Sequence, residues 1–295
     1  MKNLKTFLSF GLLCVGIMLP MTSCQRIAHK LGELTAKADN ADSVQSKNDN
    51  PVTIGDGPAT VKTRTFTGEA FFKAKISREL YADQTWNIQW PESAENCDLN
   101  KFQKELLNFF VGDEYNSIDA FISKLNNEFC GEDEWEKVSK MGESETSFDG
   151  EDGYNPYPQS THYELSEVSL EGNDIITYSK TIVYNAGSGV GAGVFINQEY
   201  MMYDLNAGKR IVYEDVFTSG SETAIAKLLK TRATNLDDYS TLMDDGFPPV
   251  HKDNFYLNYE KNEAHFLYDK YEVASGADGV VDLSIPFDAI SKYMK

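Results

Sequence analysis

The sequence is poor in cysteine and histidine, and it lacks the motifs that these residues form in metal and catalytic centres. Its 295 residues include four Cys and four His, without a C-x-x-C, H-E-x-x-H or G-x-S-x-G pattern. No two of the His lie at a short metal-ligand spacing, which argues against a zinc site. We therefore expect no cofactor, no metal and no catalytic residue recognisable from a motif.

Basic residues are also scarce. Lys and Arg number 27 against 46 Asp and Glu, which gives a formal net charge of −19 at pH 7. A chain this acidic does not bind nucleic acid or an anionic membrane surface through its own field. A cationic partner would be attracted to it. The alternative is that the acidic residues form a solvated surface that only keeps the protein soluble.

Long apolar runs are absent except near the N-terminus. The apolar stretch 7–19 follows a short basic start and is shorter than the about 20 residues that a transmembrane helix needs. It matches the apolar part of a secretory signal. Residues 19–24, Leu-Pro-Met-Thr-Ser-Cys, resemble the lipobox of bacterial lipoproteins. This predicts cleavage of a signal peptide at 1–23 and lipidation of Cys24; an ordinary secreted protein is the alternative.

The predicted lipid places the protein in the cell envelope. Two or three acyl chains on Cys24 would anchor it stably, whereas one chain binds only marginally. Gln25 follows Cys24 where an Asp would resemble an inner-membrane retention signal, so we expect the outer membrane, facing the periplasm. Residues 24–62 contain few large apolar residues, and this composition predicts a flexible tether. Loss of 1–23 removes two Lys and no acid, so the mature charge is 25 − 46 = −21.

Two cysteines remain besides Cys24 after signal cleavage. In an oxidising compartment Cys97 and Cys130 could form a disulfide that closes a loop of about 30 residues. The loop-entropy model gives such a bond roughly 3–4 kcal/mol of stabilisation. Two buried thiols are the alternative.

Alternating and helical patterns divide the remaining chain into strands and helices. The strand at 86–90 is expected to end at Pro91, since Pro cannot donate to a ladder. Residues 141–160 are polar and acidic and form a boundary or a long loop. The expected strands are 63–76, 86–90, 163–170, 175–184, 194–205, 210–213, 255–257, 265–268 and 281–285, and the expected helices are 99–110, 118–129, one after Ser221 and one from Pro286.

Strands and helices segregate along the chain instead of alternating. This order predicts an α+β fold in which helices pack on an antiparallel sheet. We expect two consecutive α/β subdomains, at 63–150 and 151–295. Between two strands of the second, Asn-Ala-Gly-Lys at 206–209 predicts a hairpin turn in which Gly208 adopts a positive φ.

Three sequence patterns are candidate functional sites. The Gly-rich segment 187–193 precedes a strand and not a helix, so it predicts a hairpin connection rather than a phosphate-binding loop. Paired carboxylates of a glycan hydrolase cannot be located from sequence, because the fold sets their spacing. Segments rich in Tyr and acids, at 253–256 and 268–279, form either a recognition surface or a packed sheet edge. The candidate ligand-contact residues are Gly189, Gly191, Asn254, Tyr256, Tyr268, Tyr271 and Asp278.

The C-terminal half also carries an ordered set of short motifs. They are Tyr203-Asp204-Leu205-Asn206-Ala207-Gly208-Lys209, Tyr213-Glu214-Asp215-Val216-Phe217, Asn254-Phe255-Tyr256-Leu257, Phe266-Leu267-Tyr268-Asp269-Lys270-Tyr271-Glu272-Val273-Ala274, Gly279 and Ile285-Pro286. Together they resemble the DUF3298 family over roughly 160–295. Trp90-Pro91, the two helices after it and the strand before it are similar to the DUF4163-type region that accompanies this family.

The resemblance implies an extracytoplasmic α+β domain without catalysis of its own. In RsiV-like anti-sigma factors of the family it implies binding of lysozyme, a strongly basic protein. Our hypothesis from the sequence is therefore a lipid-anchored envelope protein that binds a basic protein such as lysozyme, or peptidoglycan. The alternatives are an envelope glycan hydrolase with paired carboxylates and a structural lipoprotein that contacts another envelope protein.

Overall fold

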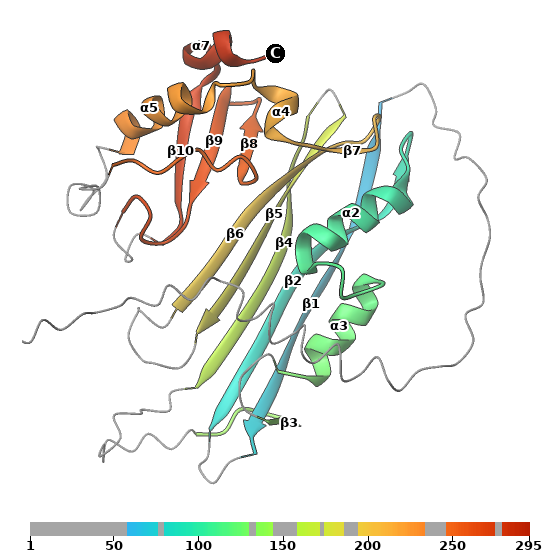
Figure 1. Ribbon diagram of the computed structural model, residues 1–295. Coiled ribbons are helices and arrows are strands. Elements are labelled where there is room, and N and C mark those ends of the chain that lie inside the picture. The colour runs from blue at the N-terminus through green and yellow to red at the C-terminus, as the bar shows by residue number, and fades with distance from the viewer. Residues whose placement is uncertain are drawn as a thin grey trace, which may run out of the picture. The chain divides into compact units, whose positions relative to one another are not determined.

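We describe a computed structural model of the chain (Figure 1). It describes residues 58–75, 80–129, 134–143, 158–171, 174–185, 194–233, 246–274 and 279–295. These residues all belong to one compact unit, Asp49–Lys295. The predicted signal peptide, the lipidation site and most of the tether lie outside the described residues.

A seven-stranded sheet forms the larger part of the fold. Its strands follow the order β3-β1-β2-β4-β5-β6-β7. Neighbours run antiparallel except β2 and β4, which are parallel from Ala82–Gln159 to Ile88–Leu165. The strands are β1 (Thr60–Ala74), β2 (Tyr81–Glu95), β3 (Trp135–Val138), β4 (Gln159–Glu171), β5 (Ile175–Asn185), β6 (Val194–Asp204) and β7 (Lys209–Ile211).

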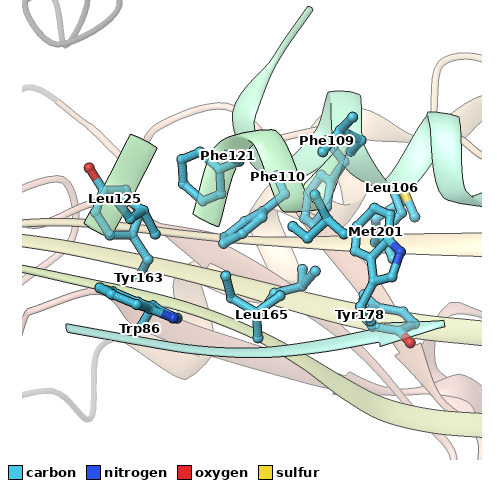
Figure 2. Close-up of a cluster of buried hydrophobic side chains, with 14 of the residues drawn as sticks. Trp86, Leu106, Phe109, Phe110, Phe121, Leu125, Tyr163, Leu165, Tyr178 and Met201 are labelled. Atoms are coloured by element: carbon cyan, nitrogen blue, oxygen red, sulfur yellow. The ribbon is translucent and has the colours of Figure 1, made fainter. Parts of the chain in front are cut away.

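Helices α2 (Leu99–Val111) and α3 (Ile118–Asn127) cover one face of this sheet. Figure 2 shows their apolar side chains directed at those of the strands. The Phe121 ring, for example, meets the Tyr163 ring edge-on at 5.5 Å between centroids. Side chains cap both helices, since Asp98 accepts from the N–H of residue 101 and Ser117 from that of residue 120. The helical stripes predicted from the sequence are confirmed.

The strand expected to end at Pro91 instead continues to Glu95 as part of β2. Pairing with β1 shifts there, because Thr63 faces Pro91 while Lys62 faces Ser93. Pro91 also lies beyond the part of β2 that pairs with β4. A sheet tolerates Pro at such irregular or unpaired positions, so the expectation that it would end the strand was wrong.

A three-stranded antiparallel sheet, ordered β10-β9-β8, forms the rest of the fold. Helices pack on one of its faces, where the rings of Phe217, Phe255 and Phe266 meet. The elements are α4 (Tyr213–Val216), α5 (Glu222–Ala233), β8 (Phe255–Asn258), β9 (Glu263–Tyr268), β10 (Val281–Pro286), α7 (Phe287–Ile290) and the 3-10 helix η2 (Ser291–Tyr293).

The two hydrophobic cores divide at β6 and not at the predicted boundary near residue 150. The seven-stranded sheet crosses that boundary through the β2–β4 pairing. Met201 and Tyr203 belong to the core under α2 and α3, whereas Met202 belongs to the core of the small sheet. Alternating side chains of one strand thus serve both cores. The α+β class is confirmed, whereas the two subdomains share a sheet.

Cys97 is buried, 7% exposed, and is a free thiol. Cys130 lies outside the described residues. The free thiol of Cys97 by itself argues against the predicted Cys97–Cys130 bond.

Candidate functional site

Three of the predicted ligand-contact residues are buried. Tyr268 is 0% exposed, and Asn254 and Tyr256 are 8% exposed. They pack or hydrogen-bond inside the fold, so their prediction as contact residues is corrected. Tyr271 is 56% exposed and stays a candidate. The remaining predicted contacts, Gly189, Gly191 and Asp278, lie outside the described residues.

Asn254 joins the small sheet to the large one. Its Nδ2 donates to the carbonyl of Gln198 at 2.9 Å, and its Oδ1 accepts from the backbone N–H of Tyr200 at 3.2 Å. These are the groups that β6 would offer to another strand, and β7 pairs with β6 only from residue 202 onward. The Asn254 amide therefore takes the place of a strand along this edge.

An aromatic stack lies beside this junction. The Tyr256 ring stacks on Tyr200 at 4.2 Å and on His265 at 4.4 Å, both with an interplanar angle of 18°. The Tyr256 hydroxyl donates to Asp282, and the His265 Nδ1 lies 2.9 Å from the same carboxylate. Burial, followed by the charge of Asp282, raises the pKa of Tyr256 and keeps the phenol neutral. Within the described residues, the ring nitrogens of His265 lie near the carboxylates of Asp282 and Glu263, and no hydroxyl or thiol is hydrogen-bonded to them.

Over β1, β2, β4 and β5, the face of the large sheet opposite α2 and α3 carries mainly polar side chains. Strand alternation places Thr, Ser, Asn, Gln and His side chains there, most of them half-buried between neighbours or exposed. The described helices pack on the other face of this sheet or on the small sheet. We call this surface the open face; its polar residues on β1, β2, β4 and β5 are Thr65, Thr67, Glu69, Lys73, Asp83, Thr85, Asn87, Gln89, Ser160, His162, Glu164, Ser166, Ser179 and Thr181, and Phe71, Tyr81 and Val183 lie among them.

Carboxylates outnumber cations on the open face. Burial raises the pKa of Asp83, and the nearby charge of Glu69 raises it further. Glu164 accepts from the Ser166 hydroxyl at 3.0 Å and lies 3.8 Å from His162. A cation brought to Asp83 would relieve its repulsion from Glu69, so this surface suits a positively charged partner.

A small pocket of about 230 Å³ lies at the edge of β6, next to the Asn254 junction. Tyr200 and Met202 of β6 form part of its wall, together with Phe255 of β8. The other lining residues come from β7, the start of α4 and the segment before β8; they are Arg210, Ile211, Val212, Glu214, Lys252 and Asp253.

A further group of charges surrounds His251. Its Nε2 lies 3.2 Å from Glu272, whose other oxygen accepts from the backbone N–H of Asp269. The hydrogen bond with Glu272 raises the pKa of His251. Burial alone would raise the pKa of Glu272, but the bonds from His251 and Asp269 hold it below its ordinary value. Because both Glu272 oxygens are engaged, this group gives no support to a hydrolytic carboxylate pair.

The described ranges hold neither a candidate metal centre nor a candidate membrane-spanning helix. There, His, Cys, Asp and Glu side chains do not gather in groups of three or more that could hold a metal ion. Over the same residues, no helix has both the length and the apolarity needed to cross a membrane.

Sequence reasoning missed the open face and the pocket. Glu69, Asp83 and Glu164 lie on three strands, and only the β1–β2 and β2–β4 pairings bring those strands together. Alternation predicts which side chains share a face of one strand, and this signal was present. It does not predict which strands are neighbours, so the combined surface could not be assembled from the sequence.

The fold defines a class of protein: a mixed α+β protein built on a large, mainly antiparallel sheet with a few packed helices. Residues 214–288 match the model of a family described as "Protein of unknown function (DUF3298)". This part of the chain is thus similar to the DUF3298 family, in agreement with the resemblance seen in the sequence. The match begins at α4 and coincides with most of the smaller core, whereas the motifs had suggested an extent from about residue 160.

Two solved structures of DUF3298 proteins share the fold. A crystal structure of a family member from Bacteroides fragilis is 14% identical, with a TM-score of 0.59, over 80% of this chain and 94% of that one. A family member from Pseudomonas aeruginosa is also 14% identical, with a TM-score of 0.53, over 80% and 95%. No curated protein matches the chain. The solved structures extend the likeness across both sheets and support the fold alone.

Proposed function

We propose that this chain is a lipid-anchored binding protein of the cell envelope, and that its open face binds a basic protein such as lysozyme. The observation that carries the proposal is the mainly polar face that Glu69, Asp83 and Glu164 share, on which Asp83 and Glu69 repel each other. The charge of −21 on residues 24–295 supports it, since complementary charge steers a cationic partner to an acidic one. The lipobox ending at Cys24 supports the anchor.

Binding is tested by calorimetric titration of the full chain, in mild detergent, with lysozyme at low and at physiological salt. We expect saturable binding that weakens with salt, because screening lengths shorten to about 8 Å at physiological ionic strength. Absence of heat at both salt concentrations would reject lysozyme as the ligand. Sedimentation of the protein with insoluble peptidoglycan then tests cell-wall material instead.

A matched pair of variants tests the open face itself. The variant E69Q/D83N/E164Q removes three charges from the open face. The control D119N/E260Q/D288N removes three exposed charges from α3, the β8–β9 turn and α7. We expect the first to weaken lysozyme binding by about tenfold or more and the control by much less, since close charges dominate over net charge. Equal weakening by both would contradict binding at this face.

The anchor has its own test. We expect the full chain to incorporate labelled palmitate and to fractionate with outer membranes. A Cys24→Ser variant should lose the label and be released from the membrane fraction. Palmitate label retained on the Cys24→Ser variant would show that the lipid is attached to another residue.

A further inference from the structure

The pocket beside β6 combines an apolar floor with charges at its rim. Tyr200, Met202 and Phe255 contribute rings and a thioether, and Arg210 and Asp253 contribute a guanidinium and a carboxylate. Its volume of about 230 Å³ is below the roughly 300–1,000 Å³ of sites for drug-sized ligands. The pocket therefore suits a ligand about as large as one or two amino acids.

Two charges at the rim are already paired. Lys252 Nζ lies 3.1 Å from Glu214 and 2.5 Å from Glu222. The hydrogen bond from Lys252 lowers the pKa of both carboxyls, so all three groups stay charged and mutually satisfied. The two members of this triad that line the pocket, Lys252 and Glu214, therefore offer little to a ligand.

Arg210 is in a different situation. Its guanidinium reaches the backbone carbonyl of Asp253 at 3.5 Å and lies over the Phe109 ring at 5.6 Å. Within the described part of the chain, no carboxylate lies at ion-pair distance from it, although acids outnumber bases 46 to 27 overall. A guanidinium has five N–H donors and matches a carboxylate in two parallel bonds. Arg210 thus has donors left for a ligand carboxylate at this rim.

Asp253 complements Arg210. Its side chain is exposed, and no Lys, Arg or His of the described residues forms an ion pair with it. Arg210 and Asp253 both line the pocket, and the Arg210 guanidinium contacts the backbone carbonyl of Asp253. An anion and a cation without an ion-pair partner among the described residues thus line the same pocket. Two such charges in one pocket fit a ligand that carries both signs.

We propose that this pocket binds a zwitterionic α-amino acid with an apolar side chain. The ligand carboxylate pairs with Arg210, its ammonium pairs with Asp253, and its side chain lies against Tyr200, Met202 and Phe255. This site is separate from the open face and does not rest on the proposed binding of a basic protein.

The test is calorimetric titration of the full chain in detergent with L-leucine and L-phenylalanine. N-acetyl-L-leucine, which lacks the ammonium, and L-leucinamide, which lacks the carboxylate, are titrated in parallel. We expect a Kd of roughly 0.1–1 mM for at least one of the two amino acids, and binding at least about tenfold weaker for both derivatives. If neither amino acid binds saturably, or if the derivatives bind equally well, the proposal is overturned.

Variants assign the two charges. Arg210→Met should weaken leucine binding about tenfold or more and should not affect L-leucinamide, which has no carboxylate to lose. Asp253→Asn should weaken leucine and spare N-acetyl-L-leucine. Arg232→Gln, at an exposed position on α5, is the control and should change nothing. Unchanged leucine binding in the first two variants would overturn the assignment; lysozyme titrations of the same samples report separately on the open face.

Discussion

Asn254 offers a direct test of how the two sheets are joined. The variant Asn254→Ala removes the donor to the Gln198 carbonyl and the acceptor for the Tyr200 N–H. Each hydrogen bond contributes about 1 kcal/mol net, and a buried group left unpaired costs about 1–3 kcal/mol. Since Asn254 is only 8% exposed, little water can replace it. We expect the free energy of unfolding to fall by about 2–4 kcal/mol.

The assay is urea unfolding of the full chain followed by far-UV circular dichroism. The matched control is Asn258→Ala at the end of β8, where the side chain accepts one exposed hydrogen bond from the N–H of Lys261 at 3.0 Å. We expect the control to cost about 1 kcal/mol or less. If Asn254→Ala costs no more than Asn258→Ala, Asn254 does not join the sheets, and a ligand-contact role would have to be reconsidered.

The variant N254D separates the two bonds. Its carboxylate still accepts from the Tyr200 N–H but faces the Gln198 carbonyl with an oxygen where Asn254 placed a donor. This repulsion favours the protonated form and so raises the folded-state pKa of the new carboxyl above its unfolded value of about 3.9. The loss of stability relative to wild type should therefore be full above the folded pKa and shrink as pH falls below it. A pH-independent loss would contradict this geometry.

Three further predictions concern packing, pH and thiol chemistry. An ideal Cβ on Gly68 would lie 2.2 Å from Trp86 Cζ2. Gly68→Ala should therefore lower the free energy of unfolding by about 1–3 kcal/mol in the wild-type chain but only slightly in a Trp86→Leu background. If urea unfolding shows that the costs of the two substitutions add, the contact is refuted. The hydrogen bond with Glu272 raises the pKa of His251, so this pair should stabilise the fold fully below about pH 6.5 and less as pH rises through the folded-state pKa. In thermal unfolding, a His251→Gln variant should lose this pH dependence of stability. A variant with the same pH profile as the wild-type chain would contradict the prediction. Burial raises the pKa of the Cys97 thiol. A thiol reagent should therefore modify Cys97 slowly in the native protein and rapidly in urea. Rapid modification of the native protein would show that the thiol is accessible.

Secondary structure could be predicted from the sequence where the residues of a single helix or turn determine it. The apolar stripes at 99–110 and 118–129 gave both covering helices, because helical spacing alone places those side chains on one face. The turn at 206–209 was also predicted, and Gly208 has the positive φ of 60° that favours Gly there. Pro91 misled the same reasoning, because its cost depends on whether a neighbouring strand needs its N–H, and that is a property of the sheet.

The sequence by itself determined the acidic charge, the lipobox pattern and the succession of strands and helices, because composition and local periodicity are properties of one segment at a time. Only the tertiary structure decided that Tyr268 and Asn254 are interior, that Glu69, Asp83 and Glu164 share one open face, and that both cores meet at β6. The reason is physical: burial and charge proximity depend on which distant strands become neighbours, and β2 and β4, joined in parallel across 63 residues of intervening chain (96–158), are such a pair.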